Sequence, residues 1–135
     1  MTSFSELKLS ESLIKGVAAL DYHEMTPIQA AALPLILAGH DVIAQAQTGS
    51  GKTAAFALGM LQMLDTAAVQ LQGLVLCPTR ELADQVSKEI RRIARPLPNV
   101  KVLTLCGGVS LRPHLASLAH EPHIVVGTPG RILEL

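Results

Sequence analysis

The octapeptide at residues 46–53 constrains the fold of this chain more than any other part of its sequence. It reads Ala-Gln-Thr-Gly-Ser-Gly-Lys-Thr and follows the apolar residues 42–44. A glycine-rich segment between a buried strand and a helix is typical of a phosphate-binding loop. Gly49 and Gly51 let the backbone turn with its N–H groups facing inward, because no Cβ stands in the way. The sequence therefore predicts a site for a nucleoside triphosphate.

Two side chains of this loop supply what a magnesium-bound triphosphate requires. Lys52 is placed to reach the β- and γ-phosphates, and the hydroxyl of Thr53 can complete the shell of a Mg²⁺ ion alongside phosphate oxygens and water. We assign the catalytic role to these two residues. A helix that begins near Lys52 also points its free N–H groups at the phosphates. The residues expected to bind the nucleotide are Ala46, Gln47, Thr48, Gly49, Ser50, Gly51, Lys52 and Thr53.

The alternative interpretation of residues 46–53 is a glycine-rich turn that binds nothing. The general pattern also begins with glycine, whereas this chain has Ala46 at that position. The spacing from Ala46 to Lys52 is nevertheless that of the pattern. We keep the nucleotide-binding interpretation because the loop directly follows a β-branched apolar run.

Length and composition are those of one domain or most of one. The 135 residues are 49% hydrophobic, which is enough to bury a sizeable core. No stretch reaches the roughly 18 apolar residues that a membrane span needs, and the amino terminus has no signal-peptide pattern. Cys77 and Cys106 stand at the ends of predicted buried strands, where a thiol behaves as a small hydrophobe. We expect a cytoplasmic protein without disulfide bonds and without a cysteine metal site.

Short apolar runs alternate along the chain with stretches of helical periodicity. The runs do not alternate between polar and apolar residues, as in a parallel sheet that helices cover on both faces. This order predicts an α/β fold with three layers and a mainly parallel sheet. The expected strands are residues 42–46, 74–77, 100–105 and 124–126, and the expected helices are residues 11–20, 27–37, 53–64, 81–95 and 111–119.

Turn-forming and polar residues follow the predicted strands. They are the segments 78–80 (Pro-Thr-Arg), 107–108 (Gly-Gly) and 128–131 (Thr-Pro-Gly-Arg). Ligands of parallel α/β sheets collect at the carboxyl ends of the strands. We therefore expect these segments to share one rim with the phosphate loop, although each by itself is also explained as ordinary turn chemistry.

Taken together and in order, these motifs resemble the first half of a DEAD-box RNA helicase. The likeness covers essentially the whole chain. It implies an α/β P-loop NTPase domain of the RecA-like type, with amino-terminal helices and the Q motif in residues 1–39 and a partial ATP-binding domain in residues 40–135, the two forming one structural unit. The matching segments are the aromatic Phe4, the Q motif at 22–29, motif I at 46–53, motif Ia at 78–83, the glycine doublet at 107–108 and motif Ib at 128–131.

The resemblance implies an adenine site in the Q motif. Gln29 would read the adenine edge, which a carboxamide can do because it offers an acceptor and donors together. Thr26 would support that pocket, and Tyr22 would lie over the ring. From the residues alone, the segment 26–29 (Thr-Pro-Ile-Gln) is also a complete helix capping box with proline at the first helical position. The family usually has glycine where this chain has Asp21.

The resemblance also implies contacts to the RNA backbone. The formal net charge of the chain is zero, so binding of nucleic acid has to come from local features. The basic stripe Lys88, Arg91 and Arg95 is expected to be a solvated helix face opposite Leu82, Val86, Ile90 and Ile93. We interpret His114, His120 and His123 as surface or loop histidines. The residues that the family assigns to RNA are Pro78, Thr79, Arg80, Gly107, Gly108, Thr128, Pro129, Gly130 and Arg131.

By the same resemblance the activity belongs to a longer parent, an ATP-dependent RNA helicase that unwinds or remodels ribosomal RNA during assembly of the large ribosomal subunit. The Asp-Glu-Ala-Asp element that holds Mg²⁺ in this family is not in the sequence. The second RecA-like domain, expected as a partner from the same parent chain, is not there either. We therefore expect these residues to bind ATP or ADP weakly, and neither to hydrolyse ATP nor to unwind RNA.

Two alternatives from other classes remain open. A small-molecule kinase uses the same phosphate loop but does not account for residues 78–83 or 128–131. A noncatalytic nucleotide-binding module is the second alternative.

Overall fold

A computed structural model describes residues 3–47, 49–106 and 111–135. The chain forms two compact units, which are described separately. The amino-terminal unit contains the residues up to Leu64 together with Arg92–Leu97, and the sheet unit contains Asp65–Arg91 and Pro98–Leu135. Within the described residues, no helix is both long enough and apolar enough to cross a membrane.

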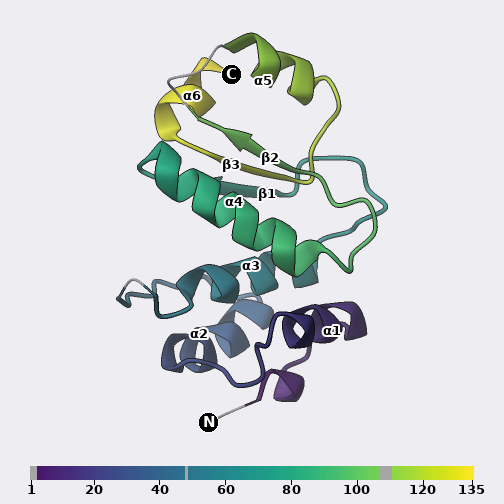
Figure 1. Cartoon of the computed structure of the whole chain (residues 1–135), viewed down its shortest axis with the longest axis vertical. Helices are drawn as coiled ribbons and strands as arrows, with labels where there is room; N and C mark the ends of the chain where they lie inside the picture. The colour runs from purple at the N-terminus through teal and green to yellow at the C-terminus, as the bar shows by residue number, and fades with distance from the viewer. Residues whose placement is uncertain (1–2, 48, 107–110) are drawn as a thin grey trace. The chain divides into compact units, whose positions relative to one another are not determined.

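The amino-terminal unit is helical. It contains a short 3-10 helix, η1 (Phe4–Glu6), followed by α1 (Glu11–Ala19), α2 (Pro27–Leu37) and α3 (Lys52–Met63) (Figure 1). Ser10 begins α1, because its hydroxyl accepts a hydrogen bond from the N–H of Leu13. Helices α2 and α3 pack closely, and a Cβ on Gly59 of α3 would collide with Ile36 of α2. The core side chains include Phe4, Leu13, Val17, Leu33 and Leu58.

The strand predicted at residues 42–46 does not form. Residues 40–47 are neither helix nor strand, and Ile43 is fully exposed. A strand satisfies its backbone N–H and C=O groups only by pairing with a neighbouring strand, and the three strands that the structure describes pair with one another. The prediction was therefore wrong at this point. The apolar run indicates that the segment has the composition of a strand, but it does not show whether a neighbouring strand is there to pair with it.

The sheet unit is built on three parallel strands. They are β1 (Gly73–Leu76), β2 (Val102–Leu105) and β3 (Ile124–Gly127), in the spatial order β1-β3-β2. Most of α4 (Arg80–Ala94) follows β1, α5 (Leu111–Leu118) follows β2, and α6 (Pro129–Glu134) follows β3. Gly127 lies level with Leu76 on one side and Leu105 on the other, so the three strands end at one edge. The α/β class with a parallel sheet is confirmed.

The sheet is less completely covered than the sequence predicted. The central strand β3 is buried along its whole length. The outer strand β1 alternates instead, with Leu74 53% exposed and Leu76 54% exposed. The unalternated run Leu-Val-Leu had indicated burial on both faces. In the structure, one face of this edge strand is open to solvent within the sheet unit.

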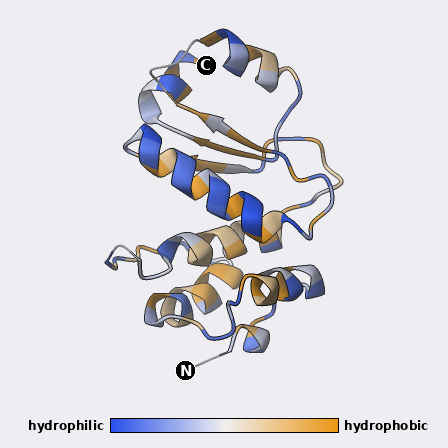
Figure 2. Ribbon diagram, in the orientation of Figure 1, coloured by the Kyte–Doolittle hydropathy of each residue, from blue (hydrophilic) through white to orange (hydrophobic). Residues whose placement is uncertain are grey.

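Helix α4 is strongly amphipathic, although its buried face differs by one position from the predicted one. Figure 2 shows an apolar stripe along α4 beside a hydrophilic face. Val86, Ile90 and Ile93 are buried as predicted, but Leu82 is 39% exposed. Ala83 and Ser87 are fully buried instead, and the Ser87 hydroxyl donates to the Ala83 carbonyl while accepting from Thr104 of β2. The small residues fit because they allow the helix to approach the strand.

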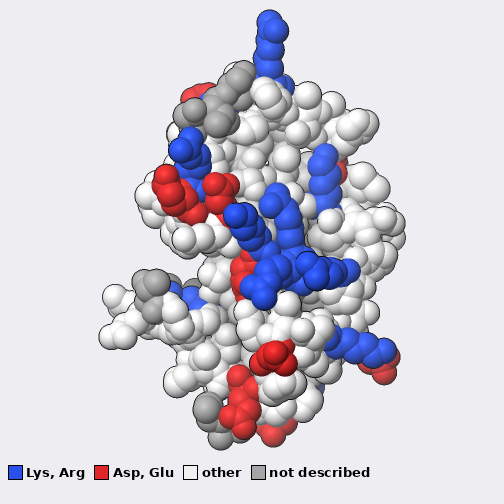
Figure 3. All heavy atoms as spheres, viewed as in Figure 1, with Lys and Arg blue, Asp and Glu red and all other residues white. Residues whose placement is uncertain are grey.

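The exposed face of α4 is basic toward its carboxyl end. Figure 3 shows Lys and Arg side chains gathered over this helix. Lys88, Arg91 and Arg95 are exposed, as predicted. Arg91 also donates to the Val102 carbonyl and to the Thr104 hydroxyl of β2, so it fastens the helix to the strand. Basic side chains in the last turns of a helix complement its dipole.

His123 is a loop residue, which is one of the two placements expected for it, but it does not lie at the surface. It lies in the loop before β3 but is only 5% exposed. Its Nδ1 accepts from the Lys101 N–H at 3.1 Å, so the proton is on Nε2, which lies 3.3 Å from the Thr66 carbonyl oxygen. The imidazole therefore connects three segments: its own loop before β3, Lys101 before β2 and Thr66 in the loop that leads to β1.

Candidate functional site

The phosphate loop leads directly into α3 in the amino-terminal unit. Gly51 is the N-cap of α3 with φ of +88°, and Gly49 also has a positive φ of +83°. This is the left-handed region that glycine adopts without steric cost. Lys52 begins the helix and is exposed, and its Nζ donates to the Ala46 carbonyl. Thr48 of the predicted loop lies outside the described residues.

Gln29 connects α2 to the phosphate loop. Its side chain is 4% exposed. The Nε2 atom donates to the Gly51 carbonyl at 3.1 Å, and the Oε1 atom accepts from the Thr26 N–H at 2.9 Å. The second of these bonds is the half of the capping box contributed by Gln29, with Pro27 at the start of the helix. The amide keeps a further hydrogen and a further lone pair, so capping does not exhaust its capacity to contact a ligand.

Two hydroxyls beside this connection are buried and make no hydrogen bond within the described residues. They are Thr26 Oγ1 and Ser50 Oγ. A buried hydroxyl without a partner costs about 1–3 kcal/mol, and such groups in native proteins usually belong to a site that something else completes. Both atoms lie in segments predicted to contact the nucleotide. The donor set therefore fits a nucleotide with its base near α2 and its phosphates at the loop.

Two aromatic side chains, Tyr22 of the Q motif and Phe4, pack against each other. Tyr22 stacks on Phe4, with ring centroids 6.4 Å apart and an interplanar angle of 25°. Phe4 is buried, whereas Tyr22 is partly exposed and keeps area for a further ring. Asp21 adopts φ of +61°, a left-handed conformation that Asp tolerates better than most residues. Asp21 thus provides the backbone conformation for which the family's usual glycine is suited.

The sheet unit brings two of the predicted RNA segments to one edge. Pro78, Thr79 and Arg80 follow β1 and are exposed. The Thr79 hydroxyl accepts from the Leu82 N–H at 3.2 Å and so begins α4. Residues 128–131 follow β3, and the Thr128 N–H donates to the Leu105 carbonyl at 3.0 Å. Gly107 and Gly108 of the third segment lie outside the described residues.

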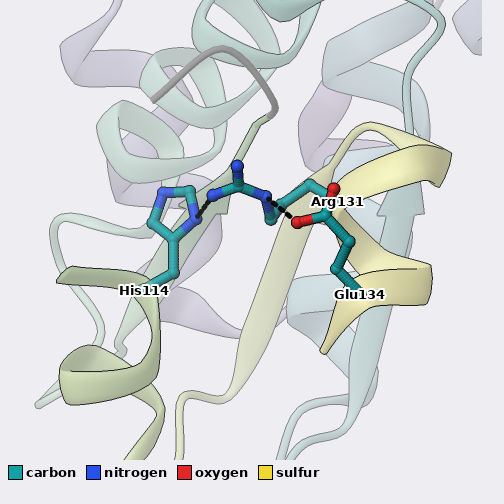
Figure 4. Close-up of polar contacts among 3 residues, drawn as sticks. All are labelled: His114, Arg131 and Glu134. Atoms are coloured by element: carbon teal, nitrogen blue, oxygen red, sulfur yellow. Dashed lines mark hydrogen bonds and ion pairs between the residues drawn. The ribbon is translucent and has the colours of Figure 1, made fainter. Parts of the chain in front are cut away.

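Among the predicted RNA residues that the structure describes, Arg131 is placed differently, because it is buried at 6% exposure. Its Nη1 lies 2.9 Å from Nδ1 of His114 on α5, and its Nε lies 3.1 Å from Oε2 of Glu134 (Figure 4). Burial, and to a smaller degree the charge of Arg131, lower the pKa of His114. The contacts of Arg131 with His114 and Glu134 were not predicted from the sequence. Glu134 stands at helical i,i+3 spacing, which is a usable signal, whereas nothing in the sequence pairs His114 with Arg131.

The two cysteines are buried and free, as predicted. Cys77 follows β1 and Cys106 follows β2. Burial raises the pKa of both thiols. They therefore stay protonated and unreactive near neutral pH. The described residues also contain no group of three or more His, Cys, Asp or Glu side chains that could hold a metal ion.

Comparison with known proteins identifies relatives of this arrangement. Residues 26–135 match the family described as DEAD/DEAH box helicase. The chain is 60% identical to the ATP-dependent RNA helicase DbpA of Escherichia coli over 135 residues, which is 99% of this chain and 30% of that protein. It is 48% identical to the DEAD-box ATP-dependent RNA helicase CshA of Bacillus cereus over 134 residues, covering 99% of this chain and 25% of that protein.

Solved structures show the same fold. A DEAD box protein from the hyperthermophile Methanococcus jannaschii superposes with a TM-score of 0.92 at 37% identity, over 99% of this chain and 36% of that one. Dbp5 of S. cerevisiae, solved bound to RNA and ADP BeF3, superposes with a TM-score of 0.84 at 32% identity, over 100% of this chain and 34% of that one. The chain thus spans about a third or less of the length of these relatives.

Proposed function

This chain belongs to the DEAD/DEAH box helicase family, whose match covers residues 26–135, and from that premise we propose that it binds ATP with Mg²⁺ and contacts the RNA backbone as part of an ATP-dependent RNA helicase. The observation that carries the proposal is the hydrogen bond from Gln29 to the Gly51 carbonyl. It joins the base-reading residue to the phosphate loop within one compact unit. The unpartnered hydroxyls of Thr26 and Ser50 beside it support the same site.

In this proposal the chain positions the nucleotide mainly through charge and hydrogen bonds. Gln29 reads the adenine edge, and Tyr22 lies over the ring on the side away from Phe4. Lys52 exchanges the Ala46 carbonyl for the phosphates, because a charged acceptor forms a stronger hydrogen bond with an ammonium than a neutral carbonyl does. Thr53 would hold Mg²⁺ through its hydroxyl, and the bound ion would neutralise phosphate charge.

RNA binding is proposed for the edge of the sheet unit. Arg80 is exposed at the start of α4 and can pair with a phosphate, and the backbone of residues 128–130 lies at the same edge. Contacts to phosphate and sugar fix the position of a strand without reading its sequence. Such contacts suit a protein that acts on many sequences. One relative of this fold, Dbp5, was solved with RNA bound.

The activity of the whole protein is proposed by similarity to its relatives. We assign the parent to ATP-dependent unwinding or remodelling of ribosomal RNA in the cytoplasm during assembly of the large ribosomal subunit, with a second RecA-like domain closing on the nucleotide. The 60% identity to the helicase DbpA supports this assignment. The 135 residues contain no Asp-Glu-Ala-Asp element. On their own we expect them to bind nucleotide without hydrolysing it, because Mg²⁺ and the attacking water lack that carboxylate.

Replacing Gln29 with alanine tests the adenine site. The variant loses the group that distinguishes adenine from guanine, so the preference for ADP over GDP should fall by about tenfold, which corresponds to about one hydrogen bond. Affinity for both nucleotides should also fall, because Gln29 holds the loop at Gly51. The ratio of the two dissociation constants, measured by calorimetry, isolates base reading from loop support.

The exposed Gln85 of α4 provides the matched control. Gln85→Ala removes the same carboxamide and should leave both dissociation constants unchanged. An unaltered ADP to GDP ratio in Gln29→Ala would mean that Gln29 serves as a helix cap and loop support without reading the base.

A further inference from the structure

The contact between His114 and Arg131 joins a residue outside every recognised motif to a residue of motif Ib. Figure 4 shows the guanidinium of Arg131 between the imidazole of His114 on α5 and the carboxylate of Glu134 on α6. The Nη1 to Nδ1 distance is 2.9 Å, and the Nε to Oε2 distance is 3.1 Å. The side chain of Arg131 is 7% exposed, whereas that of Glu134 is 54% exposed. The guanidinium is thus held from two sides inside the sheet unit.

The chemistry of the pair fixes the protonation state of His114. A guanidinium has no acceptor and stays protonated in proteins, so Nη1 is the donor and Nδ1 of His114 must be the acceptor. The imidazole is therefore neutral, with its proton on Nε2. Protonating Nδ1 would remove the acceptor and place two cations in contact. Burial and the charge of Arg131 both lower the pKa of His114 accordingly.

Helix α6 depends on hydrogen bonds to neighbouring elements because it is short. It contains 6 residues, and isolated helices of that length are not stable in water. Its first turn carries Gly130, and Thr128 precedes it as the N-cap. On one side the Thr128 N–H is fixed to the Leu105 carbonyl at the end of β2. On the other side the His114 contact fixes Arg131 to α5.

We propose that His114 is a positioning residue for RNA binding: its neutral imidazole holds Arg131, and with it the Thr128–Gly130 turn, in the arrangement that meets the RNA backbone. Acid then weakens RNA binding by protonating His114. The inference rests on the proposed function, since it concerns the same RNA-binding edge. In this proposal the role of Arg131 is to hold the Thr128–Gly130 turn in place from inside the sheet unit.

The charged neighbours decide the direction of the pH effect. Arg131 of α6 contacts His114, Glu134 lies on the far side of the Arg131 guanidinium (Figure 4), and Arg112 is the other charged residue of α5. The carboxylate of Glu134 is engaged by Arg131, which leaves the cation as the group in direct contact with the ring. The pKa of His114 is lower in the folded chain than its ordinary value of about 6.5. The stabilising contact is therefore complete above about pH 6.5 and is lost as the pH falls through the lowered value.

The test measures binding of a fluorescein-labelled 20-nucleotide poly(U) RNA to the 135-residue chain at pH 7.5, 6.5 and 5.5, at constant ionic strength. In His114→Gln, the carboxamide oxygen can still accept from Arg131 but cannot be protonated. This variant should bind as tightly as wild type at pH 7.5. Between pH 7.5 and 5.5 the wild type should lose more affinity than the variant, because only the wild type has an imidazole at this position that can take up a proton.

A second variant and two controls complete the design. His114→Leu has no acceptor for Arg131 and should bind RNA several-fold more weakly at every pH. His120 is exposed, so His120→Gln should follow the wild-type profile. Equal pH profiles for wild type and His114→Gln would overturn the role of His114. If Arg80→Ala still weakens binding in that case, the RNA edge stands and only the further inference fails. If Arg80→Ala has no effect, or the wild type binds no RNA, the proposed function and the inference fail together.

Discussion

Gly51→Ala should abolish detectable nucleotide binding and lower the free energy of unfolding by about 3 kcal/mol. Gly51 has φ of +88°, a conformation that costs a residue with a side chain about 1–2 kcal/mol. A Cβ there would collide with Nε2 of Gln29 and lie 3.1 Å from Thr26 Oγ1. Gln29 would have to leave its position and give up the hydrogen bond to the Gly51 carbonyl. Denaturant unfolding and ADP titration measure the two effects.

Gly49 supplies the control for this prediction. It has a similar φ of +83°, but a Cβ on it would meet no heavy atom within 4 Å in the part of the chain that the structure describes. Gly49→Ala should therefore cost only the backbone strain of about 1–2 kcal/mol. Equal losses of unfolding free energy in the two variants would contradict the close packing of Gln29 against the phosphate loop.

Gly127→Ala should destabilise the sheet unit by about 3 kcal/mol, the upper part of the range for overpacked cores. Gly127 ends the central strand β3. A Cβ there would lie 2.5 Å from the Leu105 carbonyl oxygen and 2.8 Å from Ile132 Cδ1. The first of these atoms belongs to the backbone of β2, which cannot move without disturbing the strand pairing. The reduction is measured as a lower denaturant midpoint with an unchanged slope.

Gly130 lies three residues further on and provides the comparison. A Cβ on Gly130 would meet no heavy atom of the described residues within 4 Å, and Gly130 is inside α6. Alanine is a better helix former than glycine by about 1 kcal/mol, so Gly130→Ala should leave stability unchanged or raise it slightly. If both alanine variants unfolded at the same denaturant concentration, the packing of β3 against β2 described above would be wrong.

Local signals predicted the helices well. The sequence Thr26-Pro27 carries a cap and a proline at the first helical position, and α2 begins at Pro27 and ends at Leu37 as predicted. Strands β1, β2 and β3 lie within two residues of the predicted bounds at each end. These elements could be predicted because propensity, capping and apolar runs are encoded within short windows of sequence.

Features that depend on partners distant in sequence could not be predicted in the same way. The apolar run at residues 42–46 forms no strand, because pairing requires a neighbour that the run itself does not contain. Leu82 was expected to be buried by its apolar character, whereas the smaller Ala83 occupies the buried position. Packing distance between helix and strand decides such a choice, and hydropathy does not report it.

The candidate site also combines features that local sequence signals predicted with features that depend on residues distant in sequence. Motif spacing identified the phosphate loop, the family resemblance pointed to Gln29, and the structure joins the two by a hydrogen bond. The burial of Arg131 and its contact with His114 were not predictable, because 17 residues separate them in sequence and only the fold brings them together. The side chain of Arg131 is buried.

The most direct test of the account is a calorimetric titration of Mg-ADP and Mg-GDP into the 135-residue chain, repeated with Lys52→Ala. We expect ADP to bind at least about tenfold more tightly than GDP, as one base-specific hydrogen bond provides. Binding should be lost in Lys52→Ala, because the ammonium is the charged partner of the phosphates. Equal affinity for the two nucleotides, or ADP binding that persists without Lys52, would contradict an adenine nucleotide site built from the Q motif and the phosphate loop.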